Sequence, residues 1–344
     1  MTSTQIRLAS RPHGVPADAN FETVTVGLPD LMDGQVLLRV IYLSLDPYMR
    51  SRMSAARSYA APTEIGHVLP GGTVCEVLES ADARFVTGNV VVSYSGWQTH
   101  AIVDGRGLRK LDPSAAPIST ALGVLGMPGF TAYAGLLEIG RPQPGESVVV
   151  AAATGPVGSA VGQIAKLKGA RAVGIAGGPD KCRALTEEFG FDAAVDHRAP
   201  DFVDQLEASV PDGIDVYFEN VGGPVAEAAC KLLNRFARIP VCGLVADYNA
   251  TVSPEGPDRL PGLFRRTLTL SLTIRGFIQD EFVADHYRNF TKDMSGWIGD
   301  GSIRYREDVV SGLENAPEAF RGLLTGRNFG KLLVQVADDP TRRP

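Results

Sequence analysis

The segment SVVVAAATGPVGSAVGQIAKLKGA, residues 147–170, contains a continuous apolar run, a turn of small residues and an amphipathic segment, in that order. The apolar run is typical of a buried strand, and the amphipathic segment is typical of a helix. Small residues at Ala153 and Gly155 let the backbone turn sharply, and Gly158 lets the helix pack close to the strand. Because a strand and a helix bracket the turn, it predicts a dinucleotide site with the pyrophosphate at the helix N-terminus.

From about Ser119 onward, apolar runs alternate with segments of helical periodicity, which indicates βαβ units and a parallel sheet. Strands are expected near residues 147–153, 172–176, 193–196, 215–220, 238–242 and 269–277. Helices are expected near residues 156–168, 179–189 and 223–233. The predicted fold class is therefore α/β, with a six-stranded, doubly wound parallel sheet of the Rossmann type. These further strands weigh against the alternative that the glycine turn belongs to a sheet protein with no ligand.

The first third of the chain has a different residue pattern. Short β-type runs occur at residues 35–45, 72–78 and 89–94, between clusters of Gly, Pro and Asp. It predicts an irregular, mostly β domain. After Gly301, a strand, a helix and a final strand are expected near residues 306–310, 316–325 and 330–336. This tail is too short to be independent, and we expect it to rejoin the first domain. The expected division is residues 1–122 with 304–344 in the mostly β substrate domain, and residues 123–303 in the dinucleotide-binding domain.

Composition narrows the class of partner. The chain has 344 residues, of which 44% are hydrophobic and 21% charged, as is typical of a soluble protein with two domains. It has 33 Lys and Arg against 39 Asp and Glu, a net charge of −6, and no basic block. This pattern gives no electrostatic footprint for nucleic acid or an anionic membrane. We therefore expect a small-molecule partner.

The cysteines and the hydropathy indicate the compartment. The four cysteines lie far apart, form no C-x-x-C pair and are too few for a disulfide framework. Residues 1–16 have no apolar core of the kind that a signal peptide needs, and the apolar stretch 121–139 is interrupted by Pro128 and several glycines. The sequence therefore predicts a cytoplasmic protein without a membrane span.

The end of the second predicted strand distinguishes NAD from NADP. After residues 172–176 an NAD enzyme usually presents Asp or Glu to the ribose hydroxyls, but this chain continues Gly-Gly-Pro-Asp-Lys to Lys181. Lys181, with His197 and Arg198 after the third strand, can neutralise a 2′-phosphate. The alternative is that these are solvated surface charges. The missing acid and the cations together favour NADP.

Two further strand ends carry polar or small residues on the side of a parallel sheet where ligands bind. The strand at 215–220 ends at Asn220, which we expect near the nicotinamide ribose. The next strand ends at Cys242 and Gly243, and the glycine would allow close approach of a flat ring. The alternative role of Cys242 is a small core residue.

These pieces resemble the zinc-free prostaglandin reductase and alkenal (double-bond) reductase family of the medium-chain dehydrogenase/reductase superfamily. Besides the stretch 147–170, the resemblance rests on these motifs: LSLDPYMR (43–50), SGWQTH (95–100), LGMPGFTAYAGLLEIG (125–140), FENVGG (218–223), CGLVADYN (242–249), RGFI (275–278) and NFGK (328–331). The resemblance implies a GroES-like first domain, a homodimer, and an enzyme that uses NADPH to saturate the carbon–carbon double bond of α,β-unsaturated ketones or aldehydes.

The resemblance also implies roles for individual residues. It places the run Gly155, Pro156, Val157 and Gly158 at the pyrophosphate. It also places Lys181 at the 2′-phosphate, Asn220 at the ribose, and the segment from Cys242 to Tyr248 along the nicotinamide. The family commonly has a tyrosine where this chain has His197. The other residues implied along the nicotinamide are Phe277, Ile278, Gln279 and Asn328.

Reduction of an enone requires a hydrogen-bond donor at the substrate. Hydride delivered to the β-carbon leaves negative charge on the carbonyl oxygen, and a neutral phenol can stabilise it. The related enzymes place a functional tyrosine at the position of Tyr248, which lies in a polar loop just past a strand end. Tyr48 is a second candidate, from the first domain. The alternative for each is a packed aromatic residue with its hydroxyl bonded locally.

A catalytic metal is not expected. Other branches of the superfamily use zinc, and His67 lies where they place a ligand. However, the position of their earlier cysteine ligand is Asp46 here, and no closely spaced cysteines offer a structural site. We expect His67 to be a loop or core histidine with a satisfied hydrogen bond.

Two other functions remain open. An NADPH quinone oxidoreductase of the same fold would need only hydride transfer and a flat apolar pocket. A cofactor-binding protein that has lost its chemistry would have a regulatory or structural role. For the expected homodimer, the apolar sixth strand near residues 268–274 is a candidate for pairing across a two-fold axis.

Overall fold

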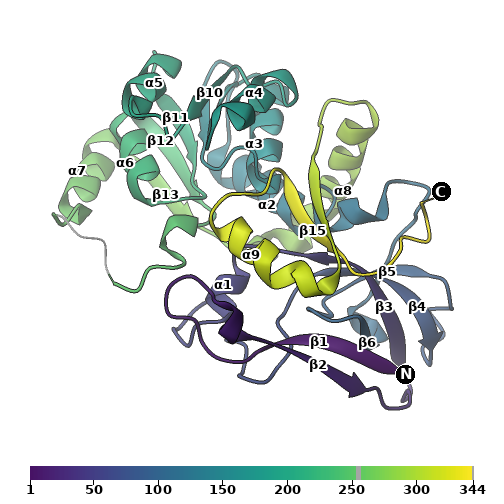
Figure 1. Ribbon diagram of the computed structural model, residues 1–344. Helices are drawn as coiled ribbons and strands as arrows, with labels where there is room; N and C mark the ends of the chain where they lie inside the picture. The colour runs from purple at the N-terminus through teal and green to yellow at the C-terminus, as the bar shows by residue number, and fades with distance from the viewer. Residues whose placement is uncertain (253–256, 343–344) are drawn as a thin grey trace. The chain divides into compact units, whose positions relative to one another are not determined.

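The computed structural model describes residues 1–252 and 257–342, and the chain divides into two compact units (Figure 1). One unit comprises Met1–Gly123 and Glu307–Pro344, and the other comprises Val124–Arg306. The chain therefore passes from one unit to the other between residues 123 and 124 and returns between 306 and 307, where the sequence placed the boundaries at 122/123 and 303/304.

The unit Val124–Arg306 is built on a six-stranded sheet in the order β10-β9-β8-β11-β12-β13. Every pair of neighbours is parallel. The strands, in chain order, are β8 Ser147–Val150, β9 Arg171–Ala176, β10 Ala193–Asp196, β11 Ile214–Phe218, β12 Leu233–Val241 and β13 Thr273–Gly276. The first and fourth of these strands are neighbours at the centre, so the connections wind outward in both directions from β8 and β11. This order confirms the doubly wound Rossmann prediction and puts the ligand-binding edge at the carboxyl ends of β8 and β11.

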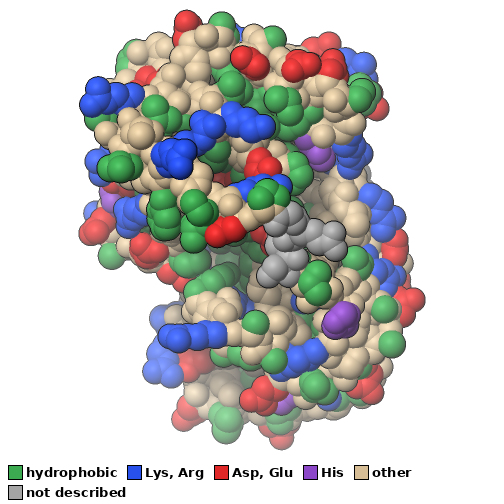
Figure 2. Space-filling view, turned by 90° about the vertical axis from the view of Figure 1, so that its left-hand side faces the viewer, with side chains coloured by type: hydrophobic (Ala, Val, Ile, Leu, Met, Phe, Trp, Pro, Cys, Tyr) green, Lys and Arg blue, Asp and Glu red, His purple; other side chains and the backbone are tan. Residues whose placement is uncertain are grey.

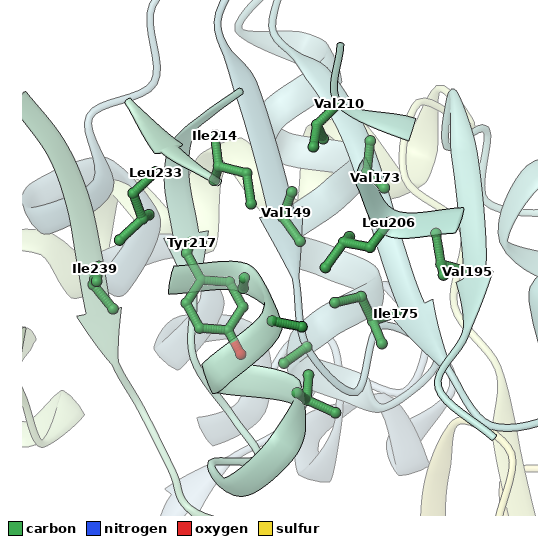
Figure 3. Close-up of a cluster of buried hydrophobic side chains, with 14 of the residues drawn as sticks. Val149, Val173, Ile175, Val195, Leu206, Val210, Ile214, Tyr217, Leu233 and Ile239 are labelled. Carbon is green, nitrogen blue, oxygen red and sulfur yellow. The ribbon is translucent and has the colours of Figure 1, made fainter. Parts of the chain in front are cut away.

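Helices cover the sheet and bury its apolar strands. In chain order they are α2 Met127–Ala134, α3 Pro156–Leu167, α4 Pro179–Glu187, α5 Phe202–Ser209, α6 Gly223–Lys231, α7 Leu260–Leu270 and α8 Val283–Gly299. Proline occupies the first turn of α3, α4 and α6, where its fixed φ suits a helix start. Side chains such as Val149, Val173, Leu206 and Tyr217 point into one core cluster beside the sheet (Figure 3). Burial of this kind explains why the strands read as continuous apolar runs.

The predicted sixth strand was wrong over its first part. Residues 269 and 270 end α7, Ser271 has φ of 52° and terminates that helix, and the strand β13 covers only Thr273–Gly276. Leu268, which the sequence put on a pairing strand, therefore lies on a helix. Leu260, Phe264 and Leu268 are spaced at i, i+4 and i+8, which is a helical period, and that pattern outweighs the β propensity of the following residues.

The other unit is mostly β, as predicted. It has a two-stranded sheet of β1 Thr2–Leu8 and β2 Phe21–Gly27 and a seven-stranded sheet in the order β14-β15-β3-β4-β5-β7, with β6 also paired to β3. The strands of the larger sheet are β3 Gln35–Ser44, β4 Thr73–Ser80, β5 Val90–Ser93, β6 His100–Asp104, β7 Arg109–Lys110, β14 Glu307–Ser311 and β15 Lys331–Gln335. Its helices are α1 Met49–Arg52 and α9 Ala316–Leu324. β15 pairs antiparallel with β3, so the end of the chain completes the sheet begun near its start. Within the described residues, no helix has both the length and the apolar character that crossing a membrane requires.

Candidate functional site

The turn between β8 and α3 has the close packing that a pyrophosphate site requires. Gly155 is the N-cap of α3, and its amide donates to the carbonyl oxygen of Ala152 at 3.0 Å. Ala152 has φ of 51°, a left-handed conformation that turns the chain sharply. A Cβ at Gly158 would lie 2.5 Å from the Ala152 carbonyl oxygen and 2.7 Å from the Ala153 Cα. Only glycine fits there, and its presence lets the helix N-terminus approach the strand end.

At the end of β9, the side chains of His197 and Arg198 lie close to Gly177, the position at which NAD enzymes usually have an Asp or Glu. A Cβ at Gly177 would lie 2.8 Å from Arg198 Nε and 2.9 Å from His197 Nε2. Lys181 lies in the first turn of α4, which begins at Pro179. The structure therefore brings His197 and Arg198 together at Gly177, and Lys181 is near enough to lower the pKa of His197. No acid stands at position 177, and two basic side chains lie beside it, which suits a 2′-phosphate rather than free ribose hydroxyls.

The end of β11 is joined to the pyrophosphate turn. The Asn220 side-chain amide donates to the Ala151 carbonyl oxygen at 2.8 Å. The preceding residue, Glu219, is buried, and its Oε1 accepts the amides of Val221 at 2.6 Å and Gly222 at 2.9 Å. Burial raises the pKa of Glu219, while those two backbone amides work in the opposite direction. Glu219 is therefore a structural anchor of the turn that carries Asn220.

Tyr248 lies against the glycine that follows β12. A Cβ at Gly243 would be 3.3 Å from the Tyr248 hydroxyl and 3.5 Å from the Asn220 carbonyl oxygen. These three residues, predicted separately from two strand ends and a loop, thus lie together at one edge of the sheet. Burial and the neighbouring Glu219 raise the pKa of Cys242 to about 12, so its thiol is neutral. That environment suits the small-residue role for Cys242.

The segment after β13 contributes differently. The Phe277 ring is buried, with ring centroids 6.3 Å from Phe218 and 6.1 Å from Phe282. Its side chain therefore packs in the core. The Ile278 amide donates to Glu281 Oε1 at 2.8 Å, and the Gln279 side chain is hydrogen-bonded to Asp280. The Phe277 side chain therefore has a packing role. The backbone of this segment and the side chains of Ile278 and Gln279 are the remaining candidates for a contact with the nicotinamide.

In the mostly β unit, Tyr48 has a partner that the sequence did not indicate. Its hydroxyl oxygen lies 2.6 Å from the hydroxyl oxygen of Tyr94, which follows β5. The Arg52 guanidinium carbon lies 5.7 Å from the Tyr48 ring centroid and 4.4 Å from that of Tyr59. Burial, Asp46 and Tyr94 raise the pKa of Tyr48, which keeps the phenol protonated. Tyr48 and Tyr94 are 46 residues apart, and no local pattern signals such a pair.

A buried ion pair supports the segment that leads to Tyr48. Lys331 Nζ lies 2.6 Å from Asp46 Oδ1, and it donates to the Leu45 carbonyl oxygen at 2.9 Å. The two charged side chains are only 2% and 7% exposed. The Ser44 hydroxyl donates to the other carboxylate oxygen of Asp46. Asp46, which stands where the zinc-using branches of the superfamily have a cysteine ligand, therefore pairs with a lysine of the same unit.

Two other predicted positions have partners of their own. The Asn328 side-chain amide donates to the Gly330 carbonyl oxygen at 2.9 Å. His67 is an exposed loop residue with Nε2 3.7 Å from Glu64 Oε2. Across residues 1–252 and 257–342, no three His, Cys, Asp or Glu side chains are grouped so as to hold a metal ion.

The fold and this geometry define a pyridine-dinucleotide oxidoreductase with a Rossmann unit and a separate β unit. Residues 4–111 match the family model described as the N-terminal domain of oxidoreductase, and residues 156–288 match the model described as zinc-binding dehydrogenase. The chain belongs to the prostaglandin reductase and alkenal reductase family of the medium-chain dehydrogenase/reductase superfamily.

Three relatives illustrate this membership. The chain is 54% identical over 332 residues to an NADPH-dependent curcumin reductase of Escherichia coli, covering 96% of each protein. It is 41% identical over 327 residues to prostaglandin reductase 1 of Sus scrofa, covering 94% of this chain and 96% of the relative. The crystal structure of CurA in complex with NADPH from Vibrio vulnificus superposes with a TM-score of 0.95 at 52% identity, covering 98% of this chain and 100% of that one.

Proposed function

We propose that this chain is an NADPH-dependent, zinc-independent reductase of the carbon–carbon double bond of α,β-unsaturated ketones or aldehydes. The observation that carries the proposal is the placement of Tyr248 against Gly243 and Asn220, at the carboxyl edge of a sheet whose β9 end is followed by two basic side chains beside Gly177. The reductases named among its relatives support the same reaction class.

Several residues of the chain would hold the cofactor. The backbone from Gly155 to Gly158 would bind the pyrophosphate at the start of α3, and Lys181, His197 and Arg198 would bind the 2′-phosphate. Asn220 and Gly243 would border the ribose and the flat nicotinamide ring. Bound NADPH supplies the hydride that the β-carbon of the substrate receives.

Tyrosine hydroxyls would do the remaining chemistry. As the β-carbon gains hydride, negative charge moves to the carbonyl oxygen, and a hydrogen-bond donor there stabilises the enolate. The Tyr248 phenol can donate this bond without first gaining a charge. We propose Tyr48, whose hydroxyl lies beside that of Tyr94, as a second candidate for such a donor. A proton added to the α-carbon then completes the saturated product.

The decisive experiment compares substrates side by side. Purified protein is given NADPH with an enone, an enal or a quinone, and products are identified by mass spectrometry. We expect loss of NADPH absorbance with the enone or enal and a product heavier by two hydrogen atoms on the former double bond. Reduction of the quinone alone would establish the quinone oxidoreductase instead. Tight NADPH binding without any oxidation would establish a non-catalytic binding protein.

We further propose a cytoplasmic homodimer that forms through α7 and β13. All four residues of β13 are exposed, and this strand is at the edge of its sheet, so its backbone can pair with a second copy. On α7, Leu260, Phe264 and Leu268 are 52%, 64% and 80% exposed. Hydrophobic side chains reach the surface on the side of the molecule that bears α7 (Figure 2). Light scattering of the wild type and of Leu268→Glu tests this interface, and a wild-type monomer would refute it.

A further inference from the structure

The proposed 2′-phosphate site contains a histidine, His197, besides the permanently charged side chains that would suffice to bind a phosphate. His197 Nε2 and Arg198 Nε both lie within 3 Å of the position that a Cβ of Gly177 would take, at 2.9 and 2.8 Å. Arg198 is cationic at any physiological pH, whereas an imidazole changes charge near neutrality. The charge of this site can therefore depend on pH through His197.

The backbone that carries these side chains is fixed independently of their charge. Asp196, the last residue of β10, accepts the amide of Gly178 at 2.8 Å and the amide of Arg198 at 2.9 Å through the same oxygen. The His197 amide donates to the Ala176 carbonyl oxygen at 3.0 Å. These bonds join the turn after β9 to the turn after β10. Protonation of the imidazole therefore changes charge at a preformed site.

The charges around the imidazole oppose its protonation in the absence of a ligand. The His197 side chain is exposed, but crowding by its neighbours removes part of its hydration, and this desolvation lowers its pKa. Arg198 and Lys181, the latter on α4, lower this pKa further, whereas Asp196 and a backbone hydrogen bond of His197 raise it. Burial and Asp196 raise the pKa of Cys182, also on α4, so that thiol is neutral. In the absence of a ligand, these surroundings therefore favour the neutral imidazole.

We propose that His197 takes up a proton when the 2′-phosphate of NADP(H) binds, and that the resulting imidazolium is a pH-dependent determinant of NADP over NAD. This inference rests on the proposed placement of the 2′-phosphate beside Gly177. Binding of NAD(H), which has no such phosphate, involves no proton uptake at this position. Preference for NADP therefore falls as the pH rises.

The sign and size of the effect follow from linkage. A phosphate dianion within a few ångströms raises a histidine pKa by about 1–3 units, and each unit corresponds to about a tenfold change in affinity. NADP affinity is then highest at low pH and falls as the pH rises through the pKa of the bound state. The 2′-phosphate itself has a pKa of about 6, and its dianion binds better than its monoanion. Ionisation of the phosphate therefore raises NADP affinity as the pH rises, opposite to the effect of His197. The informative window is therefore above about pH 7.

Calorimetry of cofactor binding, without any turnover, tests the proposal. NADP⁺ and NAD⁺ are titrated into the full-length protein at about pH 7.5 in PIPES and in Tris, whose ionisation heats differ, so that the difference reports protons exchanged. If NAD⁺ binds too weakly, adenosine 2′,5′-bisphosphate and adenosine 5′-monophosphate replace the pair. We expect net uptake of a fraction of a proton, up to about one, with NADP⁺ and none with NAD⁺.

Variants and a second measurement identify the group. His197→Gln should bind NADP⁺ without uptake and lose the fall in affinity above neutral pH, whereas His13→Gln, an exposed histidine of the other unit, should behave as wild type. NMR titration of the five histidines, with and without NADP⁺, should show one imidazole whose titration moves to higher pH. Equal uptake in His197→Gln, or no uptake in the wild type, overturns the inference. Tight NADP⁺ binding without uptake leaves the proposed function intact, whereas failure to prefer NADP⁺ over NAD⁺ at any pH contradicts that function.

Discussion

Replacement of Lys331 by methionine should strongly destabilise the mostly β unit. The lysine side chain is 2% exposed and its ammonium lies 2.6 Å from Asp46, which is 7% exposed. Methionine fills a similar volume but leaves the Asp46 carboxylate buried without a counter-charge. Loss of one partner of a buried pair costs about 3–5 kcal/mol. We expect the free energy of unfolding of this unit to fall by that amount, which is a large part of the stability of an ordinary domain.

The assay can report on this unit alone. The chain has two tryptophans. Trp97 is completely buried between Phe21 and Phe320, whereas Trp297 belongs to the other unit. In a Trp297→Phe background, urea unfolding followed by tryptophan fluorescence therefore measures the unit that contains Lys331. Lys110→Met, on an exposed strand of the same unit, is the matched control and should lose less than about 1 kcal/mol.

A double-mutant cycle tests the electrostatic reason. Asp46→Asn with Lys331→Met removes both charges, so much of the lost stability should return, and the coupling free energy should exceed about 1 kcal/mol. The reasoning would be refuted by a Lys331→Met protein no less stable than the Lys110→Met control. Additive effects of the two substitutions would also refute it, because they would mean that neither charge depends on the other.

The remaining predictions concern the cofactor and substrate residues. Tyr248→Phe should lower kcat about 100-fold while leaving NADP⁺ affinity unchanged, and unchanged turnover would remove this hydroxyl from the reaction. Lys181→Ala should weaken NADPH binding about tenfold and spare NADH, measured by fluorescence titration; equal losses would count against the phosphate role. Tyr94→Phe should lower kcat/KM only about 2–10-fold, through the lost hydrogen bond to Tyr48, and a loss as large as that of Tyr48→Phe would require a direct role for Tyr94. Gly158→Val should abolish cofactor binding, because the added atoms meet the Ala152 carbonyl oxygen, and normal affinity in that variant would contradict the turn geometry.

Most of the Rossmann unit could be predicted because each part is encoded locally. The strand, small-residue turn and helix of residues 147–170 are contiguous, and their periodicity needs no distant partner. The prediction failed at residues 269–277, where a helix end and a short strand adjoin without a strong break. There only Ser271 and Leu272 separate them, Ser271 is in a left-handed conformation, and sequence patterns do not signal that conformation for serine.

The candidate site was predicted unevenly. The missing acid after β9, together with Lys181, indicated NADP because the absence of a residue type is visible in the sequence. The crowding of His197 and Arg198 over Gly177 was not visible, since it depends on how two strand ends pair. Tyr94 and Lys331 were given no role, although both lie in or beside motifs that carried the family resemblance.

The sequence alone determined the dinucleotide turn, the doubly wound sheet and the preference for NADP, because these follow from backbone conformation and charge within short segments. Only the tertiary structure decided the contacts of Tyr48 with Tyr94, of Asp46 with Lys331, and of Tyr248 with Gly243. The partners in the first two of these contacts are 46 and 285 residues apart. Distances of a few ångströms between such residues depend on strand pairing and packing, and the chemistry of a hydroxyl or a buried charge depends on those distances.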